Sequence, residues 1–126
     1  MRSEMILNFR WHVPGLLATG SKPSTVELVE ALKEAGFKAI LSLEAVGESV
    51  TGHIRYSDID HLLLPVEDDS EVRFDASLVG EGFWRSFCEF LDVKLAKGVP
   101  VFVHCSAGIC RSVRLVERYA KERLSA

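Results

Sequence analysis

The apolar residues of this chain form short continuous runs, and segments with helical periodicity separate these runs. A continuous apolar run of strand length is typical of a strand that is buried on both faces. Residues 37–43 and 61–66 have this pattern. Gly15 and Gly20 bound a shorter apolar segment, and three apolar residues lead into His104. The sequence therefore predicts strands within 15–20, 37–43, 61–66 and 101–104.

The segment 22–36 has the pattern of an amphipathic helix. Ser24 and Glu27 have the spacing of a capping box, in which two side chains satisfy free backbone N–H groups at a helix N-terminus. Gly36 is placed to end the helix. One face is apolar and is expected to be buried: Val26, Leu28, Val29 and Leu32.

Two further helices are expected in the second half of the chain. The first runs from about residue 78 to residue 97, where Gly98 and Pro100 end it. Cys88 lies within it and is expected to be a buried structural thiol. The second helix begins at Arg111. The expected inward-facing residues are Phe83, Phe87, Phe90 and Leu91 in the first helix, and Val113, Val116, Tyr119 and Ala120 in the second.

The alternation of strands and helices predicts an α/β fold. A chain of 126 residues suits a single domain, so residues 1–126 are expected to form one unit. The expected architecture is a central, mainly parallel twisted sheet of about four or five strands, flanked by helices. In such sheets the site lies at the carboxyl ends of the strands, which is where His104 and Cys105 fall.

Composition and charge narrow the function classes. A net charge of −3 provides no overall attraction to nucleic acid or to an anionic membrane, so neither partner is expected. No apolar run is long enough to span a membrane, and the polar start of the chain does not resemble a secretion signal. Three cysteines in such a chain favour free thiols over a disulfide framework, and the expected compartment is the cytoplasm.

The loop that joins the last strand to the last helix has the composition of an anion site. Cys105 opens it, Arg111 closes it, and the residues between them are small or apolar. Backbone N–H groups of such a loop and the helix N-terminus can surround a phosphate-sized dianion. The same field favours the thiolate form of Cys105, and the Arg111 guanidinium can hold two phosphate oxygens at once. The predicted phosphate-binding residues are Ser106, Ala107, Gly108, Ile109, Cys110 and Arg111.

The string HCSAGICRS at 104–112 resembles the His-Cys-x5-Arg-Ser/Thr signature of cysteine-based protein tyrosine phosphatases. The segment NFRWHVPGLLATGSKPS near the start and the segment GFKAILSLEAVGES are similar to small atypical dual-specificity phosphatases. The resemblance implies a phosphoprotein or phosphopeptide substrate and a cysteinyl-phosphate intermediate on Cys105. It further implies that Arg111 binds the phosphate, that Ser112 donates a hydrogen bond to the Cys105 sulfur, and that His104 orients the loop. No metal or other cofactor is implied.

The resemblance also implies a general acid on a loop before the long helix, often as Pro-x-x-Asp. Asp68 fits this register because Pro65 precedes it by three positions. Asp69 is adjacent to it, and the separation of Asp75 from Cys105 is closer to that expected in the family, so both remain alternative acids. On the assignment to Asp68, residues 71–77 are an insertion or a movable lid.

Several alternatives remain open. The substrate could be a phosphoinositide or an RNA 5′-phosphate. The chemistry could instead involve sulfur or arsenic, as with the related loop of rhodanese and arsenate reductase. A third alternative is a module that binds phosphate through the same loop without turnover. Cys110 could form a disulfide with Cys105 under oxidation, although a packed side chain is the simpler interpretation. The chain ends soon after the signature helix, so a homodimer is one way to cover the exposed core. The other histidines, His12, His53 and His61, are assigned no function.

Overall fold

The computed structural model describes residues 6–43, 58–64, 75–105 and 111–124. Its strands form one sheet in the order β1-β2-β5-β3-β4. β1 runs antiparallel to β2, and the other three neighbouring pairs are parallel. The predicted α/β fold with a mainly parallel sheet is confirmed. The strands are β1 (Arg10–Val13), β2 (Leu17–Gly20), β3 (Ala39–Ser42), β4 (Asp60–Leu63) and β5 (Val101–His104).

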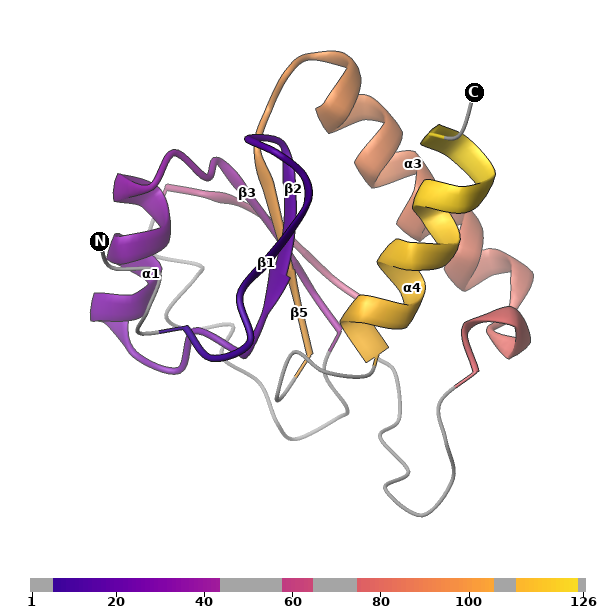
Figure 1. The fold of residues 1–126 in the computed structure, drawn as a ribbon, viewed down its shortest axis with the longest axis horizontal. Coiled ribbons are helices and arrows are strands. Elements are labelled where there is room, and N and C mark those ends of the chain that lie inside the picture. The colour runs from indigo at the N-terminus through magenta and orange to yellow at the C-terminus, as the bar shows by residue number, and fades with distance from the viewer. Residues whose placement is uncertain (1–5, 44–57, 65–74, 106–110, 125–126) are drawn as a thin grey trace.

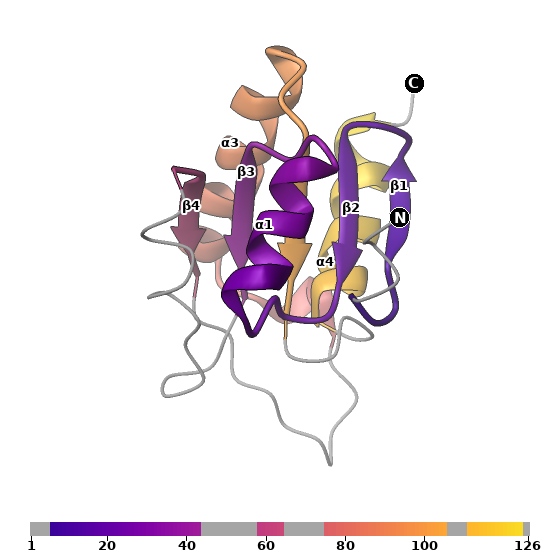
Figure 2. The ribbon, with the colours of Figure 1, turned by 90° about the vertical axis from the view of Figure 1, so that its left-hand side faces the viewer.

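Helices cover both faces of this sheet (Figure 1). One face is covered by α1, whereas α3 and α4 lie together on the other, as the view in Figure 2 also shows. A short 3₁₀ helix precedes α3, and a π-helical segment follows α4. The helices are α1 (Val26–Glu34), η2 (Ala76–Leu78), α3 (Glu81–Ala96), α4 (Arg111–Tyr119) and η3 (Ala120–Leu124).

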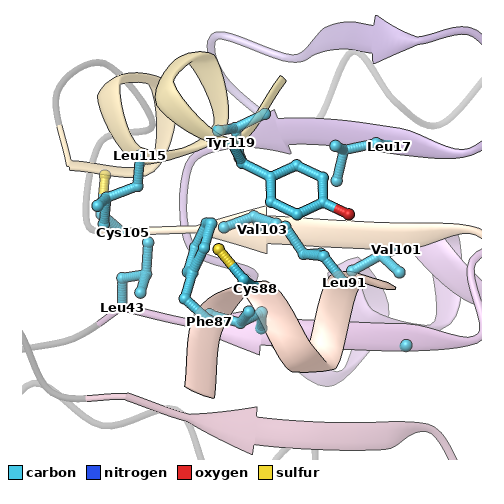
Figure 3. Close-up of a cluster of buried hydrophobic side chains, with 13 residues drawn as sticks. Leu17, Leu43, Phe87, Cys88, Leu91, Val101, Val103, Cys105, Leu115 and Tyr119 are labelled. Carbon is cyan, nitrogen blue, oxygen red and sulfur yellow. The ribbon is translucent and has the colours of Figure 1, made fainter. Parts of the chain in front are cut away.

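The sheet separates two apolar clusters, because successive residues of a strand point to opposite faces. On the α1 side, Ile40 of β3 and Phe102 of β5 pack with Phe37 and residues of α1. On the other side, Leu41 and Val103 pack beneath α3 and α4. Figure 3 shows this second cluster, with Cys105 at one end of it between Leu115 and Leu43.

Several local expectations were wrong at the first helix and at the sheet edges. Thr25, not Ser24, is the N-cap of α1, and its Oγ1 accepts a hydrogen bond from the Leu28 backbone N–H at 3.2 Å. Val26 is therefore in the first turn and is exposed, while Ala31 is buried instead. The strand predicted at 61–66 is not fully buried, because β4 lies at the edge of the sheet. The sequence pattern did not reveal β1, whose side chains are half-buried or exposed.

The second-half helices follow the expected pattern closely. Phe87, Cys88 and Leu91 are buried in α3, which confirms the predicted inward face and the buried thiol. The helix begins at Glu81 rather than near residue 78, and Leu78 in η2 is 80% exposed. In α4 the buried apolar residues include Leu115, Val116 and Tyr119, whereas Val113 is only half-buried. Within the described residues no helix is long and apolar enough to span a membrane.

Candidate active site

The carboxyl end of β5 and the first turn of α4 bring two predicted site residues together. β5 is the middle strand of the sheet, and Cys105 follows it directly. Ser112 is the second residue of α4, and its Oγ lies 3.3 Å from the Cys105 Sγ. Both residues are buried. The sulfur therefore lies at the N-terminal end of a helix, where free backbone N–H groups and the helix dipole favour a negative charge.

Arg111 is the first residue of α4 and adds a positive charge to the same end of the helix. Its side chain is buried, with 1% of the residue exposed. A guanidinium keeps its charge at any ordinary pH, so burying it requires polar or anionic partners. A buried, permanently charged fork at the start of the same helix as Ser112 suits a doubly charged oxyanion better than a neutral ligand.

His104 lies on the opposite face of β5 from the Cys105 side chain and contacts Cys105 through the backbone. The Nδ1 of His104 lies 3.0 Å from the Cys105 carbonyl oxygen. Its Nε2 lies 2.6 Å from Ser42 Oγ, and Ser42 Oγ in turn lies 2.8 Å from His61 Nε2. Burial lowers the pKa of His104 to about 4 and outweighs the hydrogen bond to the Cys105 carbonyl, which raises it, so the ring is neutral near pH 7.

Asp75 is the one predicted general-acid candidate among the described residues. It precedes η2, and its Oδ1 accepts hydrogen bonds from the Ser77 backbone N–H at 2.9 Å and from the Ser77 hydroxyl at 2.7 Å. The hydroxyl and then the N–H lower the pKa of this exposed carboxyl, because both donors stabilise the ionised form. Asp75 thus acts as a helix cap and holds its charge.

The remaining predicted site residues lie outside the described residues. They are the alternative acids Asp68 and Asp69 and the loop residues Ser106, Ala107, Gly108, Ile109 and Cys110. Among the described residues, no cluster of histidine, cysteine and carboxylate side chains has the arrangement of a metal site.

Sequence reasoning missed Ser42 and His61, which join His104 in one polar line. Ser42 lies in the apolar run of β3 and is fully buried. The sequence did contain a signal for Ser42, because a hydroxyl within a buried apolar run must find a hydrogen-bond partner. His61 gave no such signal, because a single histidine at the start of a predicted strand matches no motif.

The described fold is similar to several solved structures. Tk-PTP in its active form aligns with a TM-score of 0.71 and 16% identity over 94% of this chain and 76% of the other. P. aeruginosa TpbA aligns with a TM-score of 0.67 and 18% identity over 90% and 63% of the two chains. The human tyrosine phosphatase-like serine/threonine/tyrosine-interacting protein aligns with a TM-score of 0.69 and 22% identity over 92% and 74%.

At these identities the solved structures establish the fold, and the sequence itself establishes the family. No curated protein matches the chain. A family model does match, over residues 7–115, and this span includes Cys105, Arg111 and Ser112. The model describes the dual-specificity protein tyrosine phosphatase domain of Swiss Army Knife proteins. The chain belongs to this family of phosphatase domains, PTP-SAK.

Proposed function

We propose that this domain hydrolyses phosphate esters of tyrosine, and of serine and threonine, in proteins through a cysteinyl-phosphate intermediate on Cys105. The observation that carries the proposal is the 3.3 Å contact between Cys105 Sγ and Ser112 Oγ at the start of α4. A thiol at the end of a central strand, beside a helix N-terminus and a buried arginine, has the surroundings of a reactive thiolate. Family membership supports the same reaction class.

In the first step, the Cys105 thiolate donates an electron pair to phosphorus and forms an S–P bond. The P–O bond to the leaving group breaks, and the leaving oxygen takes a proton from a carboxylic acid. Arg111 and the backbone amides of residues 106–110 bind the oxygens that remain on phosphorus. Their charge grows in the transition state, so fixed donors aimed at them lower the barrier.

In the second step, water attacks phosphorus and the S–P bond breaks. The carboxylate formed in the first step takes a proton from this water, and Cys105 leaves as a thiolate. The Ser112 hydroxyl then donates its hydrogen bond to the sulfur, which is the atom that gains negative charge. A donor at this position improves the leaving group and therefore accelerates this step in particular.

We assign the general acid to Asp68, with Asp69 as the alternative. A general acid must be protonated when the leaving oxygen departs. Asp75 is poorly suited to this role, since the two donors from Ser77 favour its ionised form. Pro65 lies three positions before Asp68, which matches the Pro-x-x-Asp pattern that supports this assignment.

A phosphoinositide is a second candidate substrate. The fold is also similar to PTPMT1 in a complex with PI(5)P, with a TM-score of 0.66 and 16% identity over 87% of this chain. The phosphate-binding apparatus proposed above does not depend on whether a protein or a lipid carries the phosphate. The test of function therefore compares protein and lipid substrates directly.

The test compares hydrolysis of p-nitrophenyl phosphate, phosphotyrosine and phosphoserine peptides, and PI(5)P by the same protein. We expect the wild type to hydrolyse the peptides and Cys105→Ser to abolish this hydrolysis.

Asp68→Ala should slow hydrolysis of the phosphoserine peptide far more than hydrolysis of p-nitrophenyl phosphate, because nitrophenolate needs no proton to leave. Asp75→Ala is the matched control and should retain the wild-type ratio of the two rates. Faster turnover of PI(5)P than of any peptide would show that the preferred substrate is a lipid. Binding of the substrates without turnover would show that the domain is not an enzyme.

A further inference from the structure

Three polar side chains cross three neighbouring strands on the α1 side of the sheet. Ser42 of β3 is paired in register with His104 of β5, and His61 of β4 is paired with Ile40, two residues before Ser42. Residues two apart share a face, so His61 is a diagonal neighbour of Ser42. The distances are 2.8 Å from His61 Nε2 to Ser42 Oγ and 2.6 Å from Ser42 Oγ to His104 Nε2.

These hydrogen bonds form a line that ends at the Cys105 carbonyl oxygen, and this last acceptor fixes the direction of each bond. The Cys105 carbonyl oxygen can only accept, so the Nδ1 of His104 must carry the proton that it shares at 3.0 Å. In a neutral ring the other nitrogen, Nε2, is then an acceptor. The Ser42 hydroxyl must therefore donate its hydrogen to His104 Nε2, and its oxygen accepts a hydrogen bond from the N–H at His61 Nε2.

The opposite direction would require a charged ring at His104. If Ser42 donated to His61, the Nε2 of His104 would have to donate to Ser42 while Nδ1 still donates to the carbonyl. Such a doubly protonated ring is an imidazolium. Burial opposes it and lowers the pKa of His104 to about 4, which outweighs the opposite effect of the hydrogen bond to the Cys105 carbonyl. Nearby His61, Lys22 and Arg111 lower the pKa further. The line therefore runs from His61 through Ser42 to His104 and ends on the backbone of Cys105.

We propose that Ser42 and His61 are positioning residues that hold His104 in its Nδ1–H tautomer and thereby fix the carbonyl of the nucleophilic Cys105. The residue that follows this carbonyl begins the phosphate-binding loop proposed above. An edge-strand histidine thus helps set the orientation from which the loop starts. The effect on turnover rests on the proposed function, whereas the effect on the tautomer and on thiol reactivity does not.

Rotation of the His104 ring or a change of its tautomer would release the Cys105 carbonyl. The carbonyl would then no longer be held in one direction by the ring. Because amide groups near the sulfur stabilise the thiolate, a loosened loop should make Cys105 less reactive. Small displacements of such groups have large consequences, since a shift of about 1 Å can cost roughly 100-fold in rate.

The direct test is nitrogen NMR of the histidine rings in the complete chain. In the wild type, the Nδ1 of His104 should have the shift of a protonated ring nitrogen and the Nε2 that of an unprotonated one. Ser42→Ala and His61→Leu should shift this balance toward the Nε2–H tautomer, because the donor to Nε2 is removed or weakened. His61→Gln should restore the wild-type spectrum, since the glutamine side-chain NH₂ can donate to Ser42 from nearly the same position.

The second readout is the rate at which iodoacetamide alkylates Cys105 at neutral pH. Ser42→Ala and His61→Leu should lower this rate by roughly 10-fold, and kcat should fall with little change in KM. His12 offers a matched control at the other edge of the sheet, where its Nε2 lies 2.9 Å from the hydroxyl of buried Thr19. His12→Leu breaks a similar histidine–hydroxyl pair and should change neither the His104 tautomer nor the alkylation rate.

Two results would overturn the inference. One is an Nε2–H tautomer of His104 in the wild type. The other is an unchanged tautomer and an unchanged alkylation rate in both Ser42→Ala and His61→Leu. If the wild type hydrolyses no phosphate ester, the proposed function fails, and the ring spectra and alkylation rates still decide whether Ser42 and His61 position Cys105.

Discussion

Ser112 Oγ lies 3.3 Å from Cys105 Sγ, and both side chains are buried at the N-terminal end of α4. A hydroxyl at this distance stabilises negative charge on the sulfur. Hydrogen bonds to charged groups contribute about 1.5–3 kcal/mol, which corresponds to roughly 10-fold to 100-fold in rate. We predict that Ser112→Ala slows breakdown of the phosphorylated enzyme by this factor and slows its formation much less.

Rapid-mixing kinetics with p-nitrophenyl phosphate can separate the two steps. The Ser112→Ala variant should release a burst of nitrophenolate close to one equivalent of enzyme, followed by a slow steady rate. Ser112→Thr keeps the hydroxyl and is the control, so its steady rate should stay near that of the wild type. Equal slowing of the burst and of the steady rate would contradict the role assigned to Ser112.

His104 should make the stability of the domain depend on pH. Burial lowers the pKa of His104 from 6.5 to about 4, so between these values the unfolded chain binds a proton that the folded chain does not. Stability from this group is therefore complete above about pH 6.5 and is lost as the pH falls toward 4. Over the whole interval the loss is on the order of 3 kcal/mol.

Urea unfolding at a series of pH values tests this dependence. The matched variant is His104→Gln, which keeps a polar side chain and removes the titration. The free energy of unfolding of the wild type should fall more steeply with decreasing pH than that of the variant. Parallel curves, or a ring NMR titration of His104 near the ordinary histidine pKa, would show that burial does not suppress its charge.

The parallel core of the fold was predictable because its residues obey simple patterns. β3 and β5 are buried on both faces, so their continuous apolar runs identify them directly. β1 could not be identified in the same way, because an exposed or half-buried edge strand has no such run. The cap of α1 was misplaced by one residue, since Ser24 and Thr25 are adjacent and either hydroxyl can cap a helix.

Arg118 joins η2 to α4, and its loss should destabilise the domain. Its guanidinium carbon lies 3.8 Å from the centre of the Trp84 ring, and its Nη1 donates to the Ala76 carbonyl oxygen at 2.9 Å. A cation over tryptophan and a charged hydrogen bond together contribute about 2–3 kcal/mol, with some reduction for partial exposure. We predict that Arg118→Ala lowers the free energy of unfolding by roughly 2 kcal/mol.

Lys33 supplies the control for this prediction, because its contact is of the weak surface kind. It lies 3.6 Å from Glu30 on the outside of α1. Lys33→Ala should change the free energy of unfolding by less than about 0.5 kcal/mol in the same urea titration. Equal effects of the two substitutions would show that Arg118 contributes no more than an ordinary surface charge.

Gly20 has no room for a side chain. A Cβ at this position would lie 2.7 Å from Ile6 Cγ2 and 2.9 Å from Phe102 Cζ, and the Phe102 ring stacks against His104. We predict that Gly20→Ala lowers the free energy of unfolding by about 1–3 kcal/mol, because buried neighbours must shift. Gly82 in α3 has open space around its Cβ position, so Gly82→Ala should stabilise the protein by up to about 1 kcal/mol. In thermal unfolding, we expect Gly20→Ala to lower the melting temperature and Gly82→Ala to raise it. A shift of both melting temperatures in the same direction would contradict the prediction.

The site was predictable only where one local segment contains its residues. Cys105, Arg111 and Ser112 lie within eight consecutive positions of one strand–loop–helix unit, and the charge and nucleophile in that unit suggested their chemistry. Ser42 and His61 come from two other strands, and the contacts of Ser42 with both histidines depend on the strand order β5-β3-β4. Strand order arises from packing of the whole chain, so no local pattern could have placed these three residues in line.

The most direct test of the central claim is to trap the covalent intermediate. The wild type is mixed with a phosphotyrosine peptide, quenched in acid within milliseconds, and examined by mass spectrometry of its proteolytic peptides. We predict a phosphate on the sulfur of Cys105, formed and lost at rates that match turnover, and absent in Cys105→Ser. Turnover without this adduct, or a phosphate attached to another side chain, would contradict the account.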